Sequence, residues 1–211
     1  MSDILLIDKP REITSFDVIR QLRKKLGVKK MGHAGTLDPL ASGLMIIGIG
    51  NGTKKLNQYI KLPKVYQAEI LLGIKTTTGD LEGEVTEKKE VSEIAEATMK
   101  KVLGSMVGKI SLSVPLYSAV KISGKPLYQY ARRHVEIEPP SKEMEVFWIT
   151  LKKIEGPMIK IELEVASGTY VRSIAEEIGR RLRYPATLFA LRRTKIGDFR
   201  VEDAESLAPK Y

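Results

Sequence analysis

Two long runs of alternating residues constrain the fold of this chain more than any other feature. Apolar and polar residues alternate over residues 145–154 and again over residues 158–165, and Glu155, Gly156 and Pro157 separate the two runs. Alternation of this kind is typical of strands with one buried face, and a short turn between two such strands predicts an antiparallel hairpin. We therefore expect a sheet that contains residues 145–165.

Other strand and helix signals mix irregularly along the 211 residues. The apolar runs predict strands over residues 3–9, 44–49, 65–72, 117–122 and 187–196. Helical spacing predicts helices that begin after Thr14, after residues 50–53, after Ser92, at Pro126 and at residues 167–170, and Gly27 is placed to end the first of them. No repeat or linker divides the chain. We predict an α+β fold in one domain, built on a mostly antiparallel sheet.

The composition excludes several classes of protein and of site. The absence of cysteine excludes disulfides, thiolate nucleophiles and cysteine-bound zinc, and two histidines 101 residues apart argue against a histidine-based metal site. No apolar run reaches the length of a membrane span, and the first residues lack the pattern of a secretory signal. We expect a cytoplasmic protein without a metal or another cofactor.

The charge is unevenly distributed. The net charge is +9, residues 20–30 hold six Lys or Arg and no acid, and residues 80–96 hold seven acids against two lysines. Segregated positive charge is typical of a protein that binds a polyanion, because each phosphate that it neutralises releases counterions. A basic protein with no such partner has the same composition, so both interpretations stay open at this point.

The loop around Asp38 is the leading candidate for chemistry. Six of the 17 glycines lie between Gly32 and Gly52, and Asp38 stands before Pro39, which restricts it to extended conformations. An acid on a rigid loop is suited to act as a nucleophile or a general base, since both roles need precise placement. An ordinary Asp-Pro turn has the same local sequence, and the pattern alone favours that turn.

Three further residues have both a functional and a structural interpretation, and a pair of arginines is limited by the geometry of a strand. His33 can act as an acid or base or stack on a nucleobase, or it can be a hydrogen-bonded loop histidine. Tyr66 can be a stacking platform or a core tyrosine. Arg172, at a strand-to-helix junction, can pair with a carboxylate or a phosphate, or lie on the surface. Arg192 and Arg193 are neighbours in a predicted strand, so they point to opposite faces and at most one joins any single site.

Together, these segments resemble the tRNA pseudouridine synthase B family. The longest matching motif is the twelve-residue stretch from Gly32 to Gly43, Gly-His-Ala-Gly-Thr-Leu-Asp-Pro-Leu-Ala-Ser-Gly. The other matching motifs occur in the family's order over nearly the whole chain and are Asp8-Lys9-Pro10, Thr14-Ser15, Thr53-Lys54, Lys64-Val65-Tyr66, residues 117–121, residues 124–132, residues 168–172 and residues 191–194. The long motif is highly specific, whereas each short motif alone is not.

The resemblance implies a fold, a reaction and a set of residues. The fold is that of the pseudouridine synthases, a mixed catalytic domain on a curved, mostly antiparallel sheet. The reaction is isomerisation of uridine 55 in the TΨC loop of tRNA to pseudouridine, with no cofactor and no obligate protein partner, by a protein we expect to be a monomer. Asp38 matches the catalytic aspartate. The other residues that match the family's site are Tyr66, Tyr170, Arg172, His33, Lys9, Lys54 and Asp80, of which Arg172 is expected to pair with Asp38.

The chain departs from the family pattern in two places. The mobile acidic loop that includes Asp80 usually carries a further aspartate where this chain has Thr77. Many members also continue into a C-terminal PUA domain, and we expect residues 1–211 to be the catalytic domain alone. Two alternatives remain: an RNA-binding or RNA-folding module without catalysis on the same scaffold, and a pseudouridine synthase that acts on another RNA.

Overall fold

The chain divides into two compact units. The structure is a computed structural model, and it describes residues 3–133 and 135–207. Unit 1 contains residues 1–67, 164–167 and 190–211, and unit 2 contains residues 68–163 and 168–189. Strands β4 (Lys64–Leu72), β11 (Met158–Val165) and β12 (Ala186–Ile196) have residues in both units.

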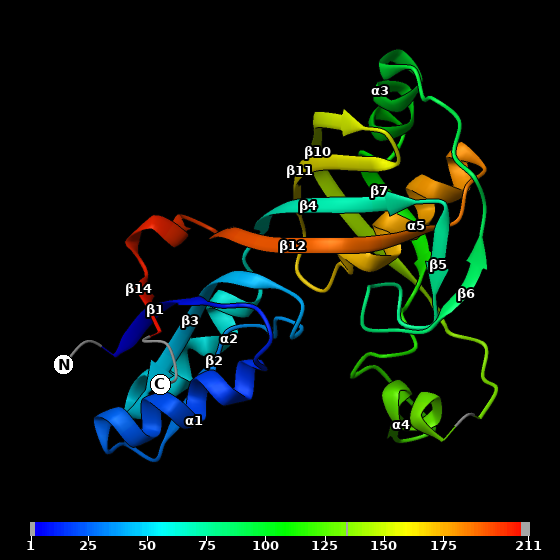
Figure 1. Ribbon diagram of the computed structural model, residues 1–211. Helices are drawn as coiled ribbons and strands as arrows, with labels where there is room; N and C mark the ends of the chain where they lie inside the picture. Colours follow the sequence, from blue (N-terminus) through cyan, green and yellow to red (C-terminus); the bar gives the residue numbers. More distant parts are fainter. Residues whose placement is uncertain (1–2, 134, 208–211) are drawn as a thin grey trace. The chain divides into compact units, whose positions relative to one another are not determined.

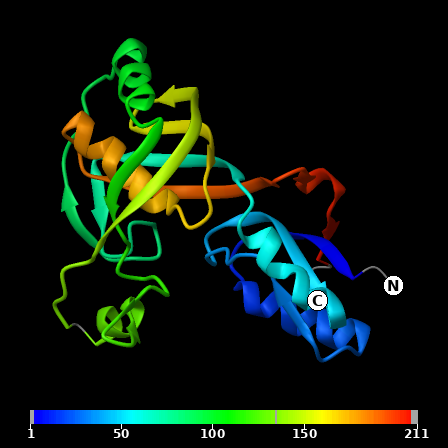
Figure 2. The same ribbon diagram turned by 180° about the vertical axis from the view of Figure 1, so that it is seen from behind.

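Unit 1 is built on strands hydrogen-bonded in the order β14-β1-β3-β12. Strand β1 (Ile4–Lys9) pairs antiparallel with β3 (Ser42–Ile49), and β3 pairs parallel with β12 through Ser42 and Gly43. The shorter elements of the unit are β2 (Met31–His33), β13 (Phe199–Arg200), β14 (Glu205–Ser206), the 3-10 helices η1 (Gly50–Lys55) and η2 (Val201–Asp203), and helix α2 (Leu56–Ile60). Helices α1 and α2 lie beside β2 and β3 (Figures 1 and 2).

Helix α1 (Ser15–Leu26) begins and ends where its sequence predicts. The Thr14 side chain accepts a hydrogen bond from the Asp17 amide at 3.0 Å, and the Asp17 carboxylate accepts one from the Thr14 amide at 2.9 Å. This capping box satisfies two donors that a helix start leaves open. Gly27, with φ at 67°, ends the helix in the left-handed region that glycine adopts without strain. The apolar face is buried and the lysines of the last turn stay exposed, so α1 presents its basic side to solvent.

Unit 2 is built on strands in the order β12-β4-β11-β10-β7. Strand β10 (Ser141–Glu155) and β11 form the predicted hairpin, and β10 also pairs antiparallel with β7 (Gly108–Ser113). Helix α5 (Val171–Leu182) contacts β7 and α3 (Glu96–Gly104) and buries most of its residues up to Gly179 (Figure 2). Two small hairpins, β5 (Ile74–Thr76) with β6 (Val85–Lys88) and β8 (Lys121–Ile122) with β9 (Lys125–Pro126), and helix α4 (Leu127–Arg132) complete the unit.

The α+β class and the mostly antiparallel sheet are confirmed, two local expectations are wrong, and one strand was missed. Helix α3 begins after Ala95 instead of Ser92, whose amide donates instead to the Tyr184 hydroxyl at 3.3 Å. The expected strand over residues 117–122 shrinks to the two residues of β8. Strand β7 was not predicted, because its two apolar residues, Ile110 and Leu112, make an alternation too short to stand out. Among the described residues, no helix has the length and apolar character needed to cross a membrane.

Candidate active site

Asp38 lies in unit 1 on the loop between β2 and β3, and three groups hold the backbone of that loop. The buried Ser15 hydroxyl accepts from the Leu37 amide at 2.8 Å and donates to the Leu37 carbonyl at 2.9 Å. The Glu12 amide donates to the Pro39 carbonyl at 2.8 Å. The Arg193 guanidinium donates to the Gly35 carbonyl at 3.2 Å. The loop is therefore fixed directly before and directly after Asp38, as a catalytic carboxylate requires.

Positive charge is buried beside this loop. Arg193 is 1% exposed, and its Nε donates to the Leu44 carbonyl at 2.7 Å. Burial and the charge of Arg193 lower the pKa of His33 below 6.5 and favour the neutral imidazole. The Nδ1 atom of His33 is buried and has no hydrogen-bond partner among the described residues. Such a buried nitrogen costs free energy unless a further group satisfies it, which keeps a binding role for His33 open.

Lys64 is a second cation near Arg193. Burial, and next the charge of Arg193, lower the pKa of Lys64 to about 8. Its Nζ donates to the carbonyls of Ile60 and Leu62, the latter at 2.7 Å. These bonds tie the end of α2 to the start of β4, two residues before Tyr66, which is buried in β4.

The other predicted residues of unit 1 differ in their surroundings. Lys9 is fully buried at the end of β1, and its Nζ donates to the carbonyls of Pro10 at 2.9 Å and Ile13 at 2.7 Å. These bonds shape the turn whose Glu12 amide holds Pro39, so Lys9 supports the Asp38 loop through that turn. Lys54 is exposed in η1.

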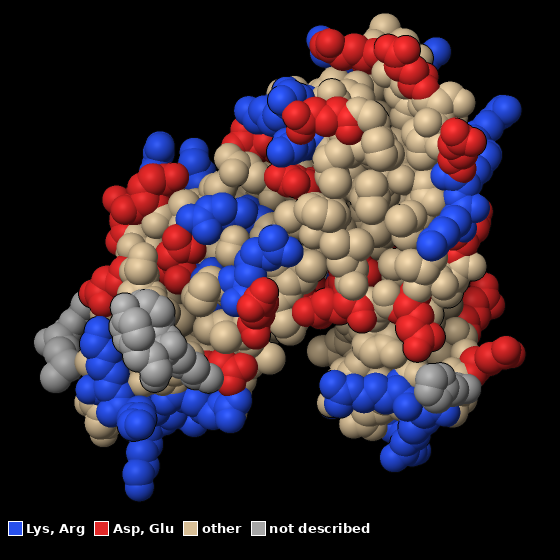
Figure 3. Space-filling view, in the orientation of Figure 1, with Lys and Arg blue, Asp and Glu red and all other residues tan. Residues whose placement is uncertain are grey.

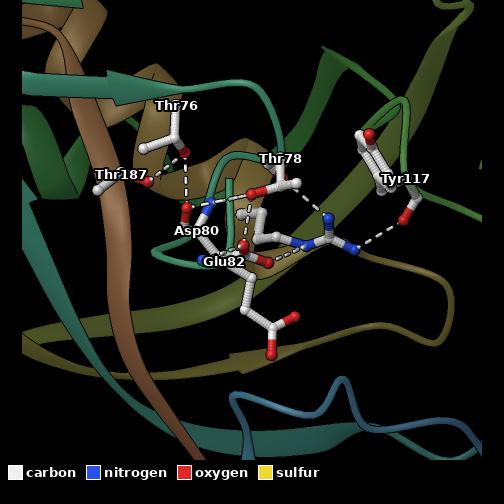
Figure 4. Close-up of polar contacts among 7 residues, drawn as sticks. Thr76, Thr78, Asp80, Glu82, Tyr117 and Thr187 are labelled. Carbon is white, nitrogen blue, oxygen red and sulfur yellow. Dashed lines mark hydrogen bonds and ion pairs between the residues drawn. The ribbon is translucent and has the colours of Figure 1, made fainter. Parts of the chain in front are cut away.

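Arg172 is the centre of a polar cluster in unit 2. It lies in the first turn of α5, is 6% exposed, and donates to the carbonyls of Thr78 at 2.9 Å and Tyr117 at 3.1 Å. Its Nε lies 3.7 Å from Oδ2 of Asp80, which is 3% exposed (Figure 4). The guanidinium therefore joins α5 to two separate loops, and the surface interpretation of Arg172 is wrong.

Asp80 is itself held by the turn that contains it. Its Oδ1 accepts from the Thr78 hydroxyl at 2.5 Å and from the Glu82 amide at 3.1 Å, and its carbonyl accepts from Thr76 Oγ1 at 2.6 Å (Figure 4). Thr76 in turn shares a 3.0 Å hydrogen bond with Thr187 of β12. The carboxylate of Asp80 thus has a fixed direction, toward Arg172.

The eight predicted residues fall into two groups. Unit 1 contains the positions from β1, η1, β4 and the Asp38 loop, namely Lys9, His33, Asp38, Lys54 and Tyr66. Unit 2 contains Tyr170, Arg172 and Asp80, with Lys142 Nζ lying 6.0 Å from the Tyr170 ring centroid. Within each unit the structure gives the partners of these residues, and the pairing of Asp38 with Arg172 stays a prediction.

Sequence reasoning did not assign roles to Ser15, Arg193 and Thr78. For Ser15 no pattern distinguishes a hydroxyl that holds a loop from one that lies in a helix start. The alternation of β12 allowed only one of Arg192 and Arg193 to join a site. The burial of Arg193 shows that it is the one beside the Asp38 loop. For Thr78, a run of three threonines beside Gly79 indicated only a turn.

Most of the excess positive charge belongs to unit 1. That unit contains 17 Lys or Arg and 10 Asp or Glu, a balance of +7 out of the net +9. On the face shown in Figure 3, lysines and arginines gather where unit 1 carries α1. A polyanion is therefore attracted mainly to the unit that carries Asp38.

Comparison with known proteins agrees with these features. The sequence model of the TruB family pseudouridylate synthases (N-terminal domain) matches residues 23–171. The tRNA pseudouridine synthase B of Listeria innocua is 41% identical over 99% of this chain and 70% of the relative, and that of Carboxydothermus hydrogenoformans is 41% identical over 98% and 74%.

The fold comparison points the same way. A chain of a solved Cbf5–Nop10–Gar1 complex superposes with a TM-score of 0.76 at 27% identity, over 97% of this chain and 52% of that chain. The chain thus spans about half the length of that structural neighbour. The sequence match extends over most of the chain, and the α+β fold and the Asp38 loop are consistent with it. The chain therefore belongs to the TruB family of pseudouridylate synthases.

Proposed function

We propose that this pseudouridine synthase isomerises uridine 55 in the TΨC loop of tRNA, with Asp38 as the catalytic carboxylate. The tRNA substrate is supported by the relatives, which are named tRNA pseudouridine synthase B and share about 40% of their residues with this chain. The observation that carries the role of Asp38 is the loop itself, whose backbone is held on both sides of that residue. The excess charge of unit 1 supplies the attraction for the RNA backbone.

The reaction requires no redox step. The N1–C1′ bond of the uridine breaks, the base turns, and a bond forms between C5 and C1′. The proton on C5 is lost and N1 gains one, so atoms and electrons balance. In this reaction a carboxylate attacks the sugar or the base, or removes a proton next to C1′, and each of these roles needs an ionised, fixed acid.

The target uridine must leave its base stack before an enzyme can reach its glycosidic bond. We assign Tyr66 the role of packing on the flipped base, and His33 the role of contacting the opened loop. A neutral His33 suits contact with uncharged bases, and its buried Nδ1 offers a group for hydrogen bonding. Arg172, oriented by Asp80, pairs with Asp38 and orients its carboxylate through a charge-assisted hydrogen bond, while Tyr170, Lys9 and Lys54 complete the site.

We propose further that the protein acts as a monomer in the cytoplasm, on tRNA, without an obligate protein partner. The structural neighbour in the Cbf5–Nop10–Gar1 complex belongs to an assembly with other proteins. Activity of the purified chain on RNA alone would therefore distinguish an enzyme that works by itself from one that needs partner proteins.

The test is an incubation of the purified protein with three RNAs, followed by mapping of pseudouridine at each nucleotide. The RNAs are an unmodified tRNA, the same tRNA with cytidine at position 55, and a structured ribosomal RNA fragment. We expect one pseudouridine, at position 55 of the first RNA. Product only in the ribosomal fragment would assign the enzyme to another RNA, and tight binding without product would favour the non-catalytic module.

A further inference from the structure

Arg193 is a fully buried arginine that the proposed chemistry does not use. It lies in β12, and its backbone pairs with Gly43 of β3. Its side chain donates to the Gly35 and Leu44 carbonyls at 3.2 and 2.7 Å. Among the described residues its hydrogen bonds go to carbonyl oxygens, and no carboxylate pairs with it. A buried charge without a counter-ion is costly, so its retention calls for a compensating role.

The two carbonyls that Arg193 holds stand at the two ends of the Asp38 loop. Gly35 follows β2, and Leu44 is the third residue of β3. The β2–β3 pairing and a 2.9 Å hydrogen bond from the Ala34 amide to the Ile46 carbonyl join the ends of the loop. The rigid guanidinium adds a link between Gly35 and Leu44, three residues before and six residues after Asp38. Ser15 and Glu12 hold the loop at Leu37 and Pro39, so Arg193 supplies the anchors that these two groups do not.

The glycines of the loop fit closely around this arginine. Gly43 has φ at 108°, and a Cβ atom there would collide with the Arg193 backbone. Gly35 has φ at 104°, and a Cβ atom there would lie 3.6 Å from the Arg193 Nη1. The close approach of β12 to the loop thus depends on glycine at position 43, and the guanidinium fills the space beneath position 35.

The neighbouring arginine shows a different arrangement and provides a control. Arg192 points to the opposite face of β12, where its Nη1 and Nη2 donate to the Asp8 carboxylate at 3.1 and 2.7 Å. Its side chain is 39% exposed. The two residues are identical and adjacent, yet only Arg193 donates to the Gly35 and Leu44 carbonyls, whereas the Arg192 side chain reaches this segment through a 3.4 Å hydrogen bond to Ser42 Oγ.

We propose that Arg193 is a positioning residue that sets the place of Asp38 by clamping both ends of its loop. The inference rests on the proposed function, since it assumes that Asp38 acts on an RNA uridine. Without the clamp the loop keeps the β2–β3 pairing and its middle anchors but loses the link between Gly35 and Leu44, and Asp38 shifts relative to the substrate. Displacement of a catalytic group by about 1 Å can slow a reaction by about a hundredfold.

The experiment compares Arg193→Lys and Arg193→Met with Arg192→Lys by two readouts. The first is hydrogen exchange of the amides of residues 35–44 in the free protein, which needs no substrate. The second is the rate of pseudouridine formation in one turnover at saturating tRNA, measured beside the tRNA dissociation constant. Lysine keeps the charge of Arg193 but not its planar fork, and methionine removes both the charge and the donors.

For the Arg193 variants we expect exchange at residues 35–44 to become at least about tenfold faster. We expect the single-turnover rate to fall by about 30- to 100-fold with the dissociation constant changed by less than about threefold. Lysine should retain more activity than methionine. In Arg192→Lys the exchange of these amides should change by less than about twofold, since the Arg192 side chain contacts this segment only through a 3.4 Å hydrogen bond to Ser42 Oγ. Wild-type exchange and rate in the Arg193 variants, or an equal increase in exchange in Arg192→Lys, would overturn the proposal.

A further variant tests the clamp if neither Arg193→Lys nor Arg193→Met folds. Gly35→Ala leaves Arg193 in place and strains the carbonyl that it holds. Faster exchange over residues 35–44 and a rate loss of about tenfold support the clamp, and wild-type values for both contradict it. If the wild-type protein forms no pseudouridine at all, the proposed function fails, while the exchange measurement still decides whether Arg193 clamps the loop.

Discussion

The two acidic residues expected at the site, Asp38 in unit 1 and Asp80 in unit 2, are held in different ways. The described anchors of the Asp38 loop bind backbone atoms, at Gly35, Leu37 and Pro39. The anchors of Asp80 bind its own carboxylate, which accepts from Thr78 and from the Glu82 amide and lies 3.7 Å from Arg172. A carboxylate oriented by its own hydrogen bonds is suited to position a neighbour. A carboxylate placed through its backbone is suited to act on a substrate.

The difference teaches how one fold can use the same residue type for two tasks. Backbone anchors fix the position of a residue whatever its side chain binds, so that position is kept when the partners of the side chain change during a reaction. Side-chain anchors satisfy the lone pairs of the carboxylate and resist any such change. We therefore assign the chemistry to Asp38 and the orientation of Arg172 to Asp80.

Apart from the loss of Asp38 itself, the largest effect among the tests of this comparison is expected for Arg172→Lys. Lysine keeps the positive charge but cannot reach the Thr78 carbonyl, the Tyr117 carbonyl and Asp80 together. We expect the single-turnover rate to fall about a hundredfold, which corresponds to about 2.7 kcal/mol of transition-state stabilisation. A rate within threefold of the wild type would show that the planar fork is not needed.

A smaller effect is expected when Asp80 loses its threonine donor. Thr78→Val keeps the shape of the side chain and removes the hydroxyl that donates to the Asp80 carboxylate. The carboxylate then loses its fixed direction, and we expect the reaction to slow about tenfold. Thr77→Val is the matched control, because the Thr77 hydroxyl accepts from the Glu84 amide and does not contact Asp80. Equal losses in the two variants would contradict the role assigned to Asp80.

Lys64 gives a prediction about stability and pH in unit 1. Its pKa is about 8 in the folded protein and 10.5 in an unfolded chain. Between these values the unfolded chain binds the proton and the folded protein does not, so the free energy of unfolding rises with pH. Below about pH 8 both states are protonated and this contribution is constant.

The matched variant for this prediction is Lys64→Met, measured by urea unfolding at pH 7.5 and pH 10. The difference in unfolding free energy, wild type minus variant, should increase by about 1–3 kcal/mol between these two pH values. Subtraction of the variant removes the pH effects of all other groups. An unchanged or decreasing difference would mean that Lys64 titrates normally in the folded protein.

The smallest effect concerns the unequal charge of the two units. Binding of tRNA should weaken steeply between ~50 and ~200 mM salt. Replacing Lys24 and Lys25 of α1 by glutamine should weaken binding by about three- to tenfold and lower the salt slope by about 1–2. Lys152 and Lys153 in unit 2 are paired with Glu162 and Glu155. Replacing these two lysines by glutamine should change both the affinity and the salt slope less. The opposite ranking would place the main RNA contacts in unit 2.

The sequence predicted those parts of the fold that local rules determine. The capping box at Thr14 and Asp17 and the glycine at position 27 define α1, because these signals act within a few residues. The alternation over residues 145–165 predicted the β10–β11 hairpin. The start of α3 was predicted wrongly at Ser92, because a distant group, the Tyr184 hydroxyl, binds the Ser92 amide.

The sequence predicted the residues of the candidate site but not the residues that hold them in place. Asp38, Arg172 and Asp80 stand in motifs, and a motif gives the identity of a residue without its neighbours in space. Ser15 contacts Leu37 across 22 residues, and Arg193 contacts Gly35 across 158. Contacts at such separations depend on the assembled fold, so no local pattern could have assigned them.

The most direct test of the account is the product yield of Asp38→Asn with unmodified tRNA. The variant keeps the size and polarity of the side chain and removes its charge, so it should bind tRNA nearly as well as the wild type, since phosphate contacts supply much of the affinity. With enzyme in excess over tRNA and incubation over many hours, we expect no pseudouridine at position 55 from Asp38→Asn. Under the same conditions Asp80→Asn should convert the tRNA slowly but completely. Complete conversion by Asp38→Asn would contradict the assignment of the chemistry to Asp38.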